Sequence, residues 1–348
     1  MIQNPILRVL VSPLTIIYSG LVRLRLGLYR LGILKAVKVR PRVVSIGNLT
    51  LGGTGKTPTV IRLAQLLSDR GNSVAILGHG YRGSSGKDTV LVSDGSRILV
   101  DSSISGDEAQ LCARRLKGVP VVVGRTKWKV SQWIDKNLAV DWIILDDGFQ
   151  HLKLGRDCDI VLVDSGWQGE QDQIVPLGRL REPLPGLKRA DVVVIVEEAG
   201  VSANPNLPQE LKRHAPEAAF FTACREFAAI GAVDGSPGPA LEELRRRKLL
   251  AFCGLAQPSQ FFSELQRQQF LICDTLEFPD HHLYTQGDLQ RIVKRAESAG
   301  AEALITTAKD AVNCAPRAFG DWSCYVYEIR MSIDSEEKLL EACLRQGL

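Results

Sequence analysis

The sequence predicts an α/β fold, in which a parallel sheet domain is followed by a second, smaller α/β domain. Short apolar runs rich in β-branched residues alternate with stretches of helical periodicity, which is typical of a parallel sheet with both faces covered. A stretch rich in Gly and Pro, Gly231–Pro239, then marks a boundary. With 348 residues, the chain is long enough for two domains.

The elements expected before the boundary begin with a buried strand at residues 42–47, a Gly-rich loop and a helix at about Thr57–Arg70. A second helix is expected at Asp107–Leu116. Further strands are expected at Val74–Leu77, Val119–Val123, Trp142–Leu145, Ile160–Val163 and Val192–Val196.

The elements expected beyond the boundary are strands at Lys248–Cys253 and Ala303–Thr306, with helices at Pro258–Gln268 and Gln286–Ala299. We therefore expect four parts. These are an N-terminal segment at 1–40, a core domain at 41–228, a linker at 229–247 and a smaller C-terminal domain at 248–348.

Positive charge is concentrated at the start of the chain. Residues 1–68 contain ten Lys and Arg and no Asp or Glu, whereas the rest holds 33 basic and 39 acidic residues. The net charge of +4 is therefore a property of the N-terminus, and a nucleic-acid partner is not expected. The eight cysteines form no Cys-x-x-Cys pair, which favours a reducing compartment over a zinc ribbon or a disulfide framework.

The N-terminal segment combines an apolar stripe with basic side chains. The uncharged run Val9–Val22 has fourteen residues and contains Pro13, so we expect it to be too short to cross a bilayer. No signal-peptide cleavage site follows it. Leu21, Leu24, Leu28 and Leu31 recur at helical spacing, with Arg23 and Arg30 on another face. This pattern predicts a helix at an anionic membrane surface; the alternative is a helix packed on its own domain.

The Gly-rich loop at Gly47–Pro58 lies between a predicted strand and a predicted helix, which is the setting of a phosphate-binding P-loop. Lys56 would reach the β- and γ-phosphates of a nucleotide, and the Thr57 hydroxyl would bind Mg²⁺. The loop departs from the strict pattern at Thr50, where Gly is usual. The predicted nucleotide-binding residues are Thr50, Leu51, Gly52, Gly53, Thr54, Gly55, Lys56 and Thr57. The strand Trp142–Leu145 ends in Asp146 and Asp147, which suits the acidic side of a Mg²⁺ site.

The motif Asp146-Asp-Gly-Phe-Gln-His151, together with the loop, closely resembles the tetraacyldisaccharide 4′-kinase family of Gram-negative bacteria. Further matching motifs are Gly80-Tyr81, Gly106-Asp-Glu-Ala109, Arg156-Asp-x-Asp159, Gly178-Arg-Leu-Arg-Glu-Pro183, Phe278-Pro-Asp-His-His-x-Tyr284 and Thr306-Thr-Ala-Lys-Asp310. The sequence departs from the family pattern at His79, Gln257 and Asn313.

The resemblance implies an ATP-dependent kinase that phosphorylates the 4′-hydroxyl of an acylated glucosamine disaccharide 1-phosphate in lipid A biosynthesis. ATP and Mg²⁺ are the implied cofactors. The implied location is the cytoplasmic face of the inner membrane, with monotopic attachment and no obligate protein partner.

The resemblance also implies that Asp107 is the general base and that it pairs with His281. From the sequence alone, Asp107 is instead interpreted as a helix N-cap and His281 as a surface residue. We expect Glu108 to join Thr57, Asp146 and Asp147 around the metal. The expected substrate-binding residues are Asn48, Gln150, His151, Arg179 and Arg181. For the two arginines, a phosphate site and a solvated surface pair both remain open; His151 can also merely support the Asp146–Asp147 turn.

Two other functions fit a P-loop protein with this sequence. The first is a regulatory or partition-type ATPase that acts on a protein partner, and the second is a soluble small-molecule kinase. A GTPase would normally carry an Asn-Lys-x-Asp motif, and Thr307-Ala-Lys-Asp310 has the wrong spacing. The soluble kinase leaves the apolar N-terminal stripe unexplained.

Overall fold

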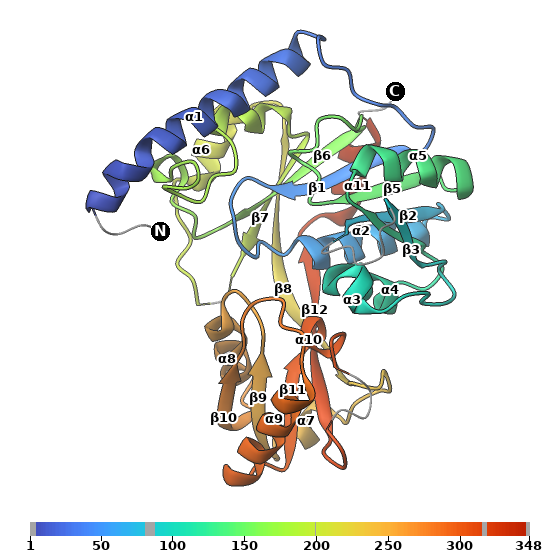
Figure 1. Cartoon of the computed structure of the whole chain (residues 1–348), viewed down its shortest axis with the longest axis vertical. Helices are drawn as coiled ribbons and strands as arrows, with labels where there is room; N and C mark the ends of the chain where they lie inside the picture. Colours follow the sequence, from blue (N-terminus) through green and yellow to red (C-terminus); the bar gives the residue numbers. More distant parts are fainter. Residues whose placement is uncertain (1–4, 81–87, 199, 315–318, 346–348) are drawn as a thin grey trace.

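The computed structural model describes residues 5–80, 88–198, 200–314 and 319–345. Twelve strands form one sheet in the order β10-β9-β11-β12-β8-β7-β6-β1-β5-β2-β4-β3 (Figure 1). The strands are β1 Arg42–Asn48, β2 Val74–His79, β3 Thr89–Ser93, β4 Val121–Gly124, β5 Trp142–Asp146, β6 Cys158–Asp164, β7 Val192–Glu197, β8 Ala219–Ala232, β9 Lys248–Cys253, β10 Leu271–Glu277, β11 Ala303–Thr307 and β12 Cys324–Ile333.

The helices flank this sheet. They are α1 Pro5–Arg30, α2 Lys56–Asp69, α3 Ser102–Ser105, α4 Asp107–Arg115, α5 Lys127–Asn137, α6 Leu207–His214, α7 Leu241–Leu244, α8 Pro258–Arg267, α9 Gln286–Ser298, α10 Ala308–Ala311 and α11 Glu336–Arg345, with short 3₁₀ turns at Gly169–Gln171 and Leu184–Arg189. Neighbouring strands are parallel except where β12 meets β8 and β3 meets β4. The predicted α/β class with a mainly parallel sheet is therefore confirmed.

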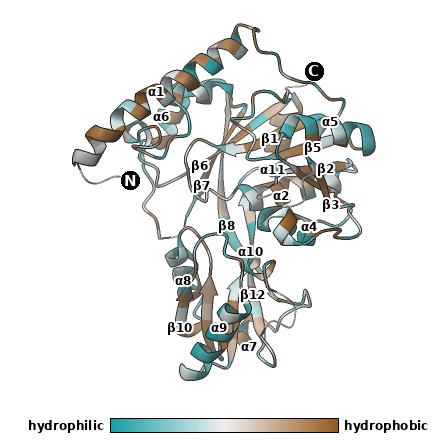
Figure 2. Ribbon diagram, in the orientation of Figure 1, coloured by the Kyte–Doolittle hydropathy of each residue, from teal (hydrophilic) through white to brown (hydrophobic). Residues whose placement is uncertain are grey.

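Two lobes share the sheet: the first holds β1–β7 with α2, α4, α5, α6 and α11, and the second holds β9–β11 with α8 and α9. The first lobe is built around β1. β1 pairs in parallel with β5 on one side and β6 on the other, and six of its seven residues are buried. Apolar residues of α2, α4 and α11 pack on one face of these strands, whereas α5 and the segment that includes α6 pack on the other. Because the strands are covered on both faces, they are apolar throughout, which is why their runs are visible in the sequence (Figure 2).

The second lobe is joined to the first by two long antiparallel strands. β8 pairs with β7 through residues 219–224 and with β12 through residues 223–232, and β12 continues into contact with β11. The chain therefore crosses between the lobes along β8 and β12 inside the sheet, and the crossing begins before the predicted linker at 229–247. That segment holds the end of β8, a turn closed by the Gly231–Pro237 bridge, and α7.

The predicted C-terminal boundary also differs from the structure. Within the predicted domain at 248–348, α11 returns to the first lobe, where Leu339, Leu340 and Cys343 belong to the same core as the strands around β1. Arg62 of α2 forms an ion pair with Glu336 of α11. β12 pairs with β8 and so carries the chain back to the first lobe. No local sequence pattern indicates this pairing.

The N-terminal helix α1 is longer than the uncharged run suggested. It extends over 26 residues, with Pro13 inside it. Among the described residues, Val9–Arg30 is the one helix long and apolar enough to cross a membrane, and none of it is buried. The expectation that the segment is too short to span was therefore wrong on length, because the helix continues beyond Arg23.

Candidate active site

The phosphate loop connects β1 to α2 as the sequence predicts. Gly55 precedes α2 with φ of 81°, a left-handed conformation that favours glycine. The amide of Asn48 donates to the Thr54 hydroxyl at 3.0 Å, which fastens the start of the loop to its end. A Cβ atom added at Gly52 or Gly53 would meet nothing within 4 Å. The loop therefore offers an anion open space and the free N–H groups at the start of α2.

The two acids after β5 lie beside this loop. Asp147 has φ of 50°, and its carboxylate lies 3.7 Å from the Lys56 ammonium. Arg181 donates to both Asp147 oxygens, at 2.8 and 2.9 Å. Burial alone would raise the pKa of Asp147, but the charges of Lys56 and Arg181 outweigh it and lower that pKa. Lys56, Asp147 and Arg181 thus form one charged cluster at the carboxyl end of the sheet.

Lys127 completes this cluster and was missed by the sequence analysis. Its ammonium is buried and donates to the Asp146 backbone oxygen at 2.8 Å. Burial lowers the pKa of Lys127 to about 8. Burial and the nearby Glu108 raise the pKa of Asp146 to about 7. The sequence feature that could have identified Lys127 is its position just beyond β4, at the carboxyl end of a strand, where α/β proteins place their functional residues.

The Asp146–His151 motif packs directly against β1. A Cβ atom added at Gly47 would lie 2.6 Å from Phe149 Cβ, so only glycine allows this approach. Gln150 donates to the Asn48 backbone oxygen at 3.0 Å and to Glu182 at 3.0 Å. Burial and the charge of Lys127 lower the pKa of His151 to about 4, which keeps its ring neutral at physiological pH.

The two arginines of the 178–183 motif lie in a segment that runs beside the phosphate loop. The Leu51 amide donates to the Arg179 backbone oxygen and the Arg181 amide donates to the Leu49 oxygen, both at 2.7 Å. The Arg179 side chain contacts Asp172 at 3.4 Å and is 38% exposed. The interpretation of both arginines as a solvated surface pair is therefore wrong for Arg181, which is held by Asp147.

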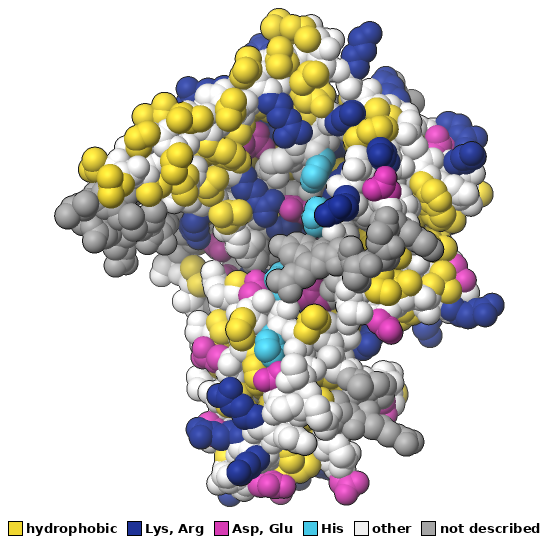
Figure 3. Space-filling view, in the orientation of Figure 1, with side chains coloured by type: hydrophobic (Ala, Val, Ile, Leu, Met, Phe, Trp, Pro, Cys, Tyr) yellow, Lys and Arg dark blue, Asp and Glu magenta, His cyan; other side chains and the backbone are white. Residues whose placement is uncertain are grey.

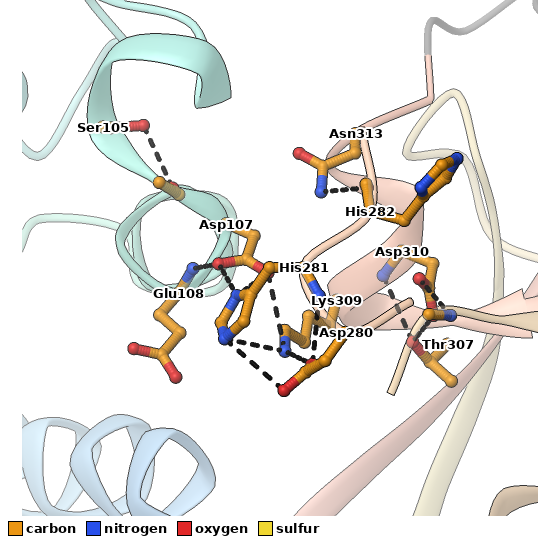
Figure 4. Close-up of polar contacts among 12 residues, drawn as sticks. Ser105, Asp107, Glu108, Asp280, His281, His282, Thr307, Lys309, Asp310 and Asn313 are labelled. Carbon is orange, nitrogen blue, oxygen red and sulfur yellow. Dashed lines mark hydrogen bonds and ion pairs between the residues drawn. The ribbon is translucent and has the colours of Figure 1, made fainter. Parts of the chain in front are cut away.

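Asp107 and His281 meet across the two lobes, although 174 positions separate them in the chain (Figure 4). His281 Nδ1 lies 2.8 Å from one Asp107 oxygen and 3.0 Å from the other. Asp107 is buried and is the first residue of α4, with Gly106 at the N-cap, so the N-cap interpretation was wrong by one position. Burial alone would raise the pKa of Asp107, but the hydrogen bond with His281 and the charge of Lys309 outweigh burial and lower that pKa.

Two more residues of the second lobe surround this pair and were not singled out from the sequence. Lys309 follows β11 and lies 3.7 Å from Asp107 and 2.7 Å from Asp280. The hydrogen bond with Asp107 raises the pKa of His281. His282 turns away, because it stacks on Phe278 and bonds to Asp288 at 3.1 Å.

The three positions that depart from the family pattern lie in different parts of the structure. The Asn313 amide donates to the His282 backbone oxygen at 3.2 Å, whereas Gln257 occupies the N-cap of α8. His79 is the last residue of β2. Tyr81 of the Gly80-Tyr81 motif lies outside the described residues.

The predicted metal residues do not form a site made by protein groups alone. Within the described ranges, no three His, Cys, Asp or Glu side chains are grouped so as to hold a metal ion. The chemistry nevertheless fits Mg²⁺, because Asp146 Oδ1 is buried without a hydrogen-bond partner beside Glu108 and Asp147. Mg²⁺ is commonly held by one or two carboxylates together with substrate phosphates, which such a site allows.

Comparison with known proteins agrees with this geometry. The profile of the family described as tetraacyldisaccharide-1-P 4′-kinase matches residues 7–347. A tetraacyldisaccharide 4′-kinase of Halothermothrix orenii is 37% identical over 323 residues, covering 89% of this chain and 84% of its own. One of Geobacter metallireducens is 37% identical over 342 residues, covering 97% and 98%.

A solved structure gives the same result at the level of the fold. The crystal structure described as "apo" form LpxK from Aquifex aeolicus in complex with ATP has a TM-score of 0.79 and 30% identity to this chain. It covers 98% of this chain and 100% of its own. The resemblance inferred from the motifs is confirmed: the chain belongs to the tetraacyldisaccharide 4′-kinase family and is an ATP-dependent kinase of lipid A biosynthesis.

Proposed function

We propose that Asp107 is the general base that activates the 4′-hydroxyl of the tetraacylated disaccharide 1-phosphate. The observation that carries this proposal is the buried Asp107 carboxylate bonded to His281 at 2.8 Å. The hydroxyl oxygen forms a bond to the γ-phosphorus of ATP, the bond from that phosphorus to the ADP oxygen breaks, and the hydroxyl proton passes to Asp107. His281 orients the carboxylate for this transfer.

The nucleotide lies along residues Thr50–Thr57 in this proposal, with Lys56 at its β- and γ-phosphates. Thr57, Asp146, Asp147 and Glu108 are the residues that would hold Mg²⁺. When bound, the cation neutralises negative charge on the phosphates. The buried Asp146 oxygen without a partner supports this placement. Lys127 supports the same edge of the sheet by fixing the Asp146 backbone.

The substrate phosphate and sugar are proposed to contact the segment beside the loop. Arg179 is exposed enough to reach the 1-phosphate, and Arg makes bidentate contacts with such groups. Asn48, Gln150 and His151 are assigned to the same substrate side. Asn48 is buried and donates to Thr54, and Gln150 donates to the Asn48 backbone oxygen and to Glu182. Arg181 orders this surface through Asp147.

We propose that α1 attaches the enzyme to the cytoplasmic face of the inner membrane as a monotopic anchor. Apolar side chains on its outer side are strongly exposed, between 58% and 72% for Val9, Leu10, Leu14, Ile16, Ile17, Leu21 and Leu24 (Figure 3). Val11, Thr15, Ser19, Val22, Leu26 and Tyr29 are half-buried on another side. The exposed apolar side and the contact of Tyr18 with the Arg181 backbone oxygen together support a position in the membrane surface over a span.

A hydrogen bond joins the anchor to the active site. The Tyr18 hydroxyl donates to the Arg181 backbone oxygen at 2.9 Å, in the segment beside the phosphate loop. An acylated substrate held in the same membrane surface would present its sugar to this side of the molecule. The basic residues Arg23, Arg25 and Arg30 would favour anionic lipids.

The test is a phosphoryl-transfer assay with radiolabelled ATP and the disaccharide 1-phosphate in detergent micelles, beside a control without lipid. We expect label in the lipid product for the unaltered enzyme. Asp107→Asn should lose about 10²–10⁴-fold in kcat, the usual contribution of a general base, while ATP binding measured by calorimetry stays unchanged. Full turnover by this variant would overturn the base assignment.

A further inference from the structure

Lys309 lies at the centre of the contacts between the lobes, beside the proposed base. Its ammonium is within 2.7 Å of Asp280 Oδ1, 3.5 Å of His281 Nε2 and 3.7 Å of Asp107 Oδ2 (Figure 4). The side chain is only 20% exposed. A lysine in such a position loses hydration and rotamer freedom, and here carboxylates on two sides offset that loss.

The backbone beneath Lys309 is held in place by its neighbour Asp310. The carboxylate of Asp310 is buried and accepts bonds from the Gly254 amide and the Tyr284 hydroxyl, each at 2.8 Å. Its amide donates to the Thr307 hydroxyl at 3.1 Å, which caps α10. The start of α10 is therefore fixed to β9 and to the segment that carries His281, so that Lys309 cannot drift relative to its partners.

The charges around the pair require a cation at this place. Asp107 and Asp280 both lie against His281, and two carboxylates near one imidazole would repel each other. Lys309 contacts both of them. Among the described residues, two groups face His281 Nε2: Lys309 Nζ at 3.5 Å and Asp280 Oδ2 at 3.7 Å. Because an ammonium group only donates and is the nearer of the two, it favours the form in which Nε2 accepts. His281 then carries its proton on Nδ1 and donates it to Asp107.

We propose that Lys309 is a positioning residue for phosphoryl transfer: it selects the His281 tautomer that donates to Asp107 and holds the Asp107 carboxylate ready to accept the hydroxyl proton. This inference rests on the proposed role of Asp107 as the base. Lys309 acts through His281 and Asp107, and it lies in the second lobe after β11, whereas the phosphate-binding Lys56 starts α2 beside the phosphate loop.

The experiment compares Lys309→Met, Lys309→Arg and the matched control Lys294→Met, an exposed lysine on α9 of the same lobe. Initial rates are measured with both substrates varied. Lys309→Met should lower kcat by about five- to tenfold, no more than loss of His281 and less than loss of the base itself, with KM for ATP within about twofold of normal. Lys309→Arg should keep more of kcat than Lys309→Met because it keeps the positive charge, although the larger guanidinium fits the site less well. Lys294→Met should behave like the unaltered enzyme.

A second arm separates positioning from a general structural effect. In a His281→Ala background, Lys309→Met should lower kcat by less than about threefold, because its path of action is already broken. If Lys309→Met fails to fold, Asp280→Asn replaces it, and loss of that partner should also lower kcat without changing KM for ATP. Thermal unfolding checks each variant.

The inference is overturned if Lys309→Met keeps kcat within about twofold of normal, if Lys309→Arg is no better than Lys309→Met, or if the full loss persists without His281. Asp107→Asn, assayed in parallel, distinguishes the two levels of the proposal. Full activity of Asp107→Asn would refute the base assignment itself. An inactive Asp107→Asn beside a normal Lys309→Met would refute only the role of Lys309.

Discussion

The contact between Asp107 and His281 can be measured with a double-mutant cycle. The perturbations are Asp107→Asn, which keeps the shape of the side chain but removes the carboxylate, and His281→Ala, which removes the ring. The two residues lie in different lobes and bond at 2.8 Å. If they act in one step, the loss in the double variant is much smaller than the product of the two single losses.

The size of the coupling follows from the geometry. A hydrogen bond to a charged group contributes about 1.5–3 kcal/mol. Because the His281 side chain is 39% exposed, water competes for its partner, and we take the lower end of that range. A coupling of about 1.5 kcal/mol is roughly tenfold in rate. We therefore expect His281→Ala to cost about tenfold in kcat alone and less than about twofold when Asp107→Asn is already present.

The assay is initial-rate phosphoryl transfer with the lipid in micelles, together with ATP binding by calorimetry to show that the nucleotide site is intact. Circular dichroism confirms that each variant is folded. Single losses that multiply fully in the double variant would refute the coupling. Asp107 would then have only a structural role at the start of α4, and Asp147 would be the next candidate for the base.

The other predictions concern the loop, the anchor and the packing of the motif. Lys56→Ala should lower kcat by orders of magnitude with an unchanged circular dichroism spectrum, and near-normal turnover would contradict the phosphate-loop assignment. Deleting residues 1–34 should reduce co-sedimentation with anionic vesicles and raise KM for lipid but not for ATP; unchanged vesicle binding would place attachment elsewhere. Gly47→Ala should destabilise the protein by about 1–3 kcal/mol in denaturant unfolding, because its Cβ would lie 2.6 Å from Phe149 Cβ, whereas Gly20→Ala, which meets nothing, should not destabilise it.

The local parts of the site could be predicted from the sequence because each is a short pattern. A buried strand, a Gly-rich turn and a helix start lie within residues 42–57, so backbone geometry alone brings Lys56 to the phosphates. The acids after β5 follow from the same logic, since adjacent parallel strands end at one edge. The resemblance to a family then supplied the pairing of Asp107 with His281, which neither residue signals by itself.

The parts that could not be predicted depend on contacts distant in sequence. Lys127 looks like any surface lysine in a helix, and only the fold buries it against Asp146. The return of α11 to the first lobe depends on the pairing of β12 with β8, whose residues are a mixture of buried and half-exposed ones. Such mixed strands lack the continuous apolar run that made the central strands recognisable.

Helix α4 connects the base to the arrangement of the two lobes. Asp107 is its first residue, and near its last turn Arg114 donates to the backbone oxygens of Ala311 and Val312 at 3.3 and 3.4 Å. Arg115 forms an ion pair with Glu328 of β12. Because Ala311 ends the short helix α10 that carries Lys309, one rigid helix contacts the second lobe at both ends. A shift of the lobe that separated His281 from Asp107 would also break the Arg114 contacts, so the geometry of the base and the position of the lobe are set by the same nine-residue helix.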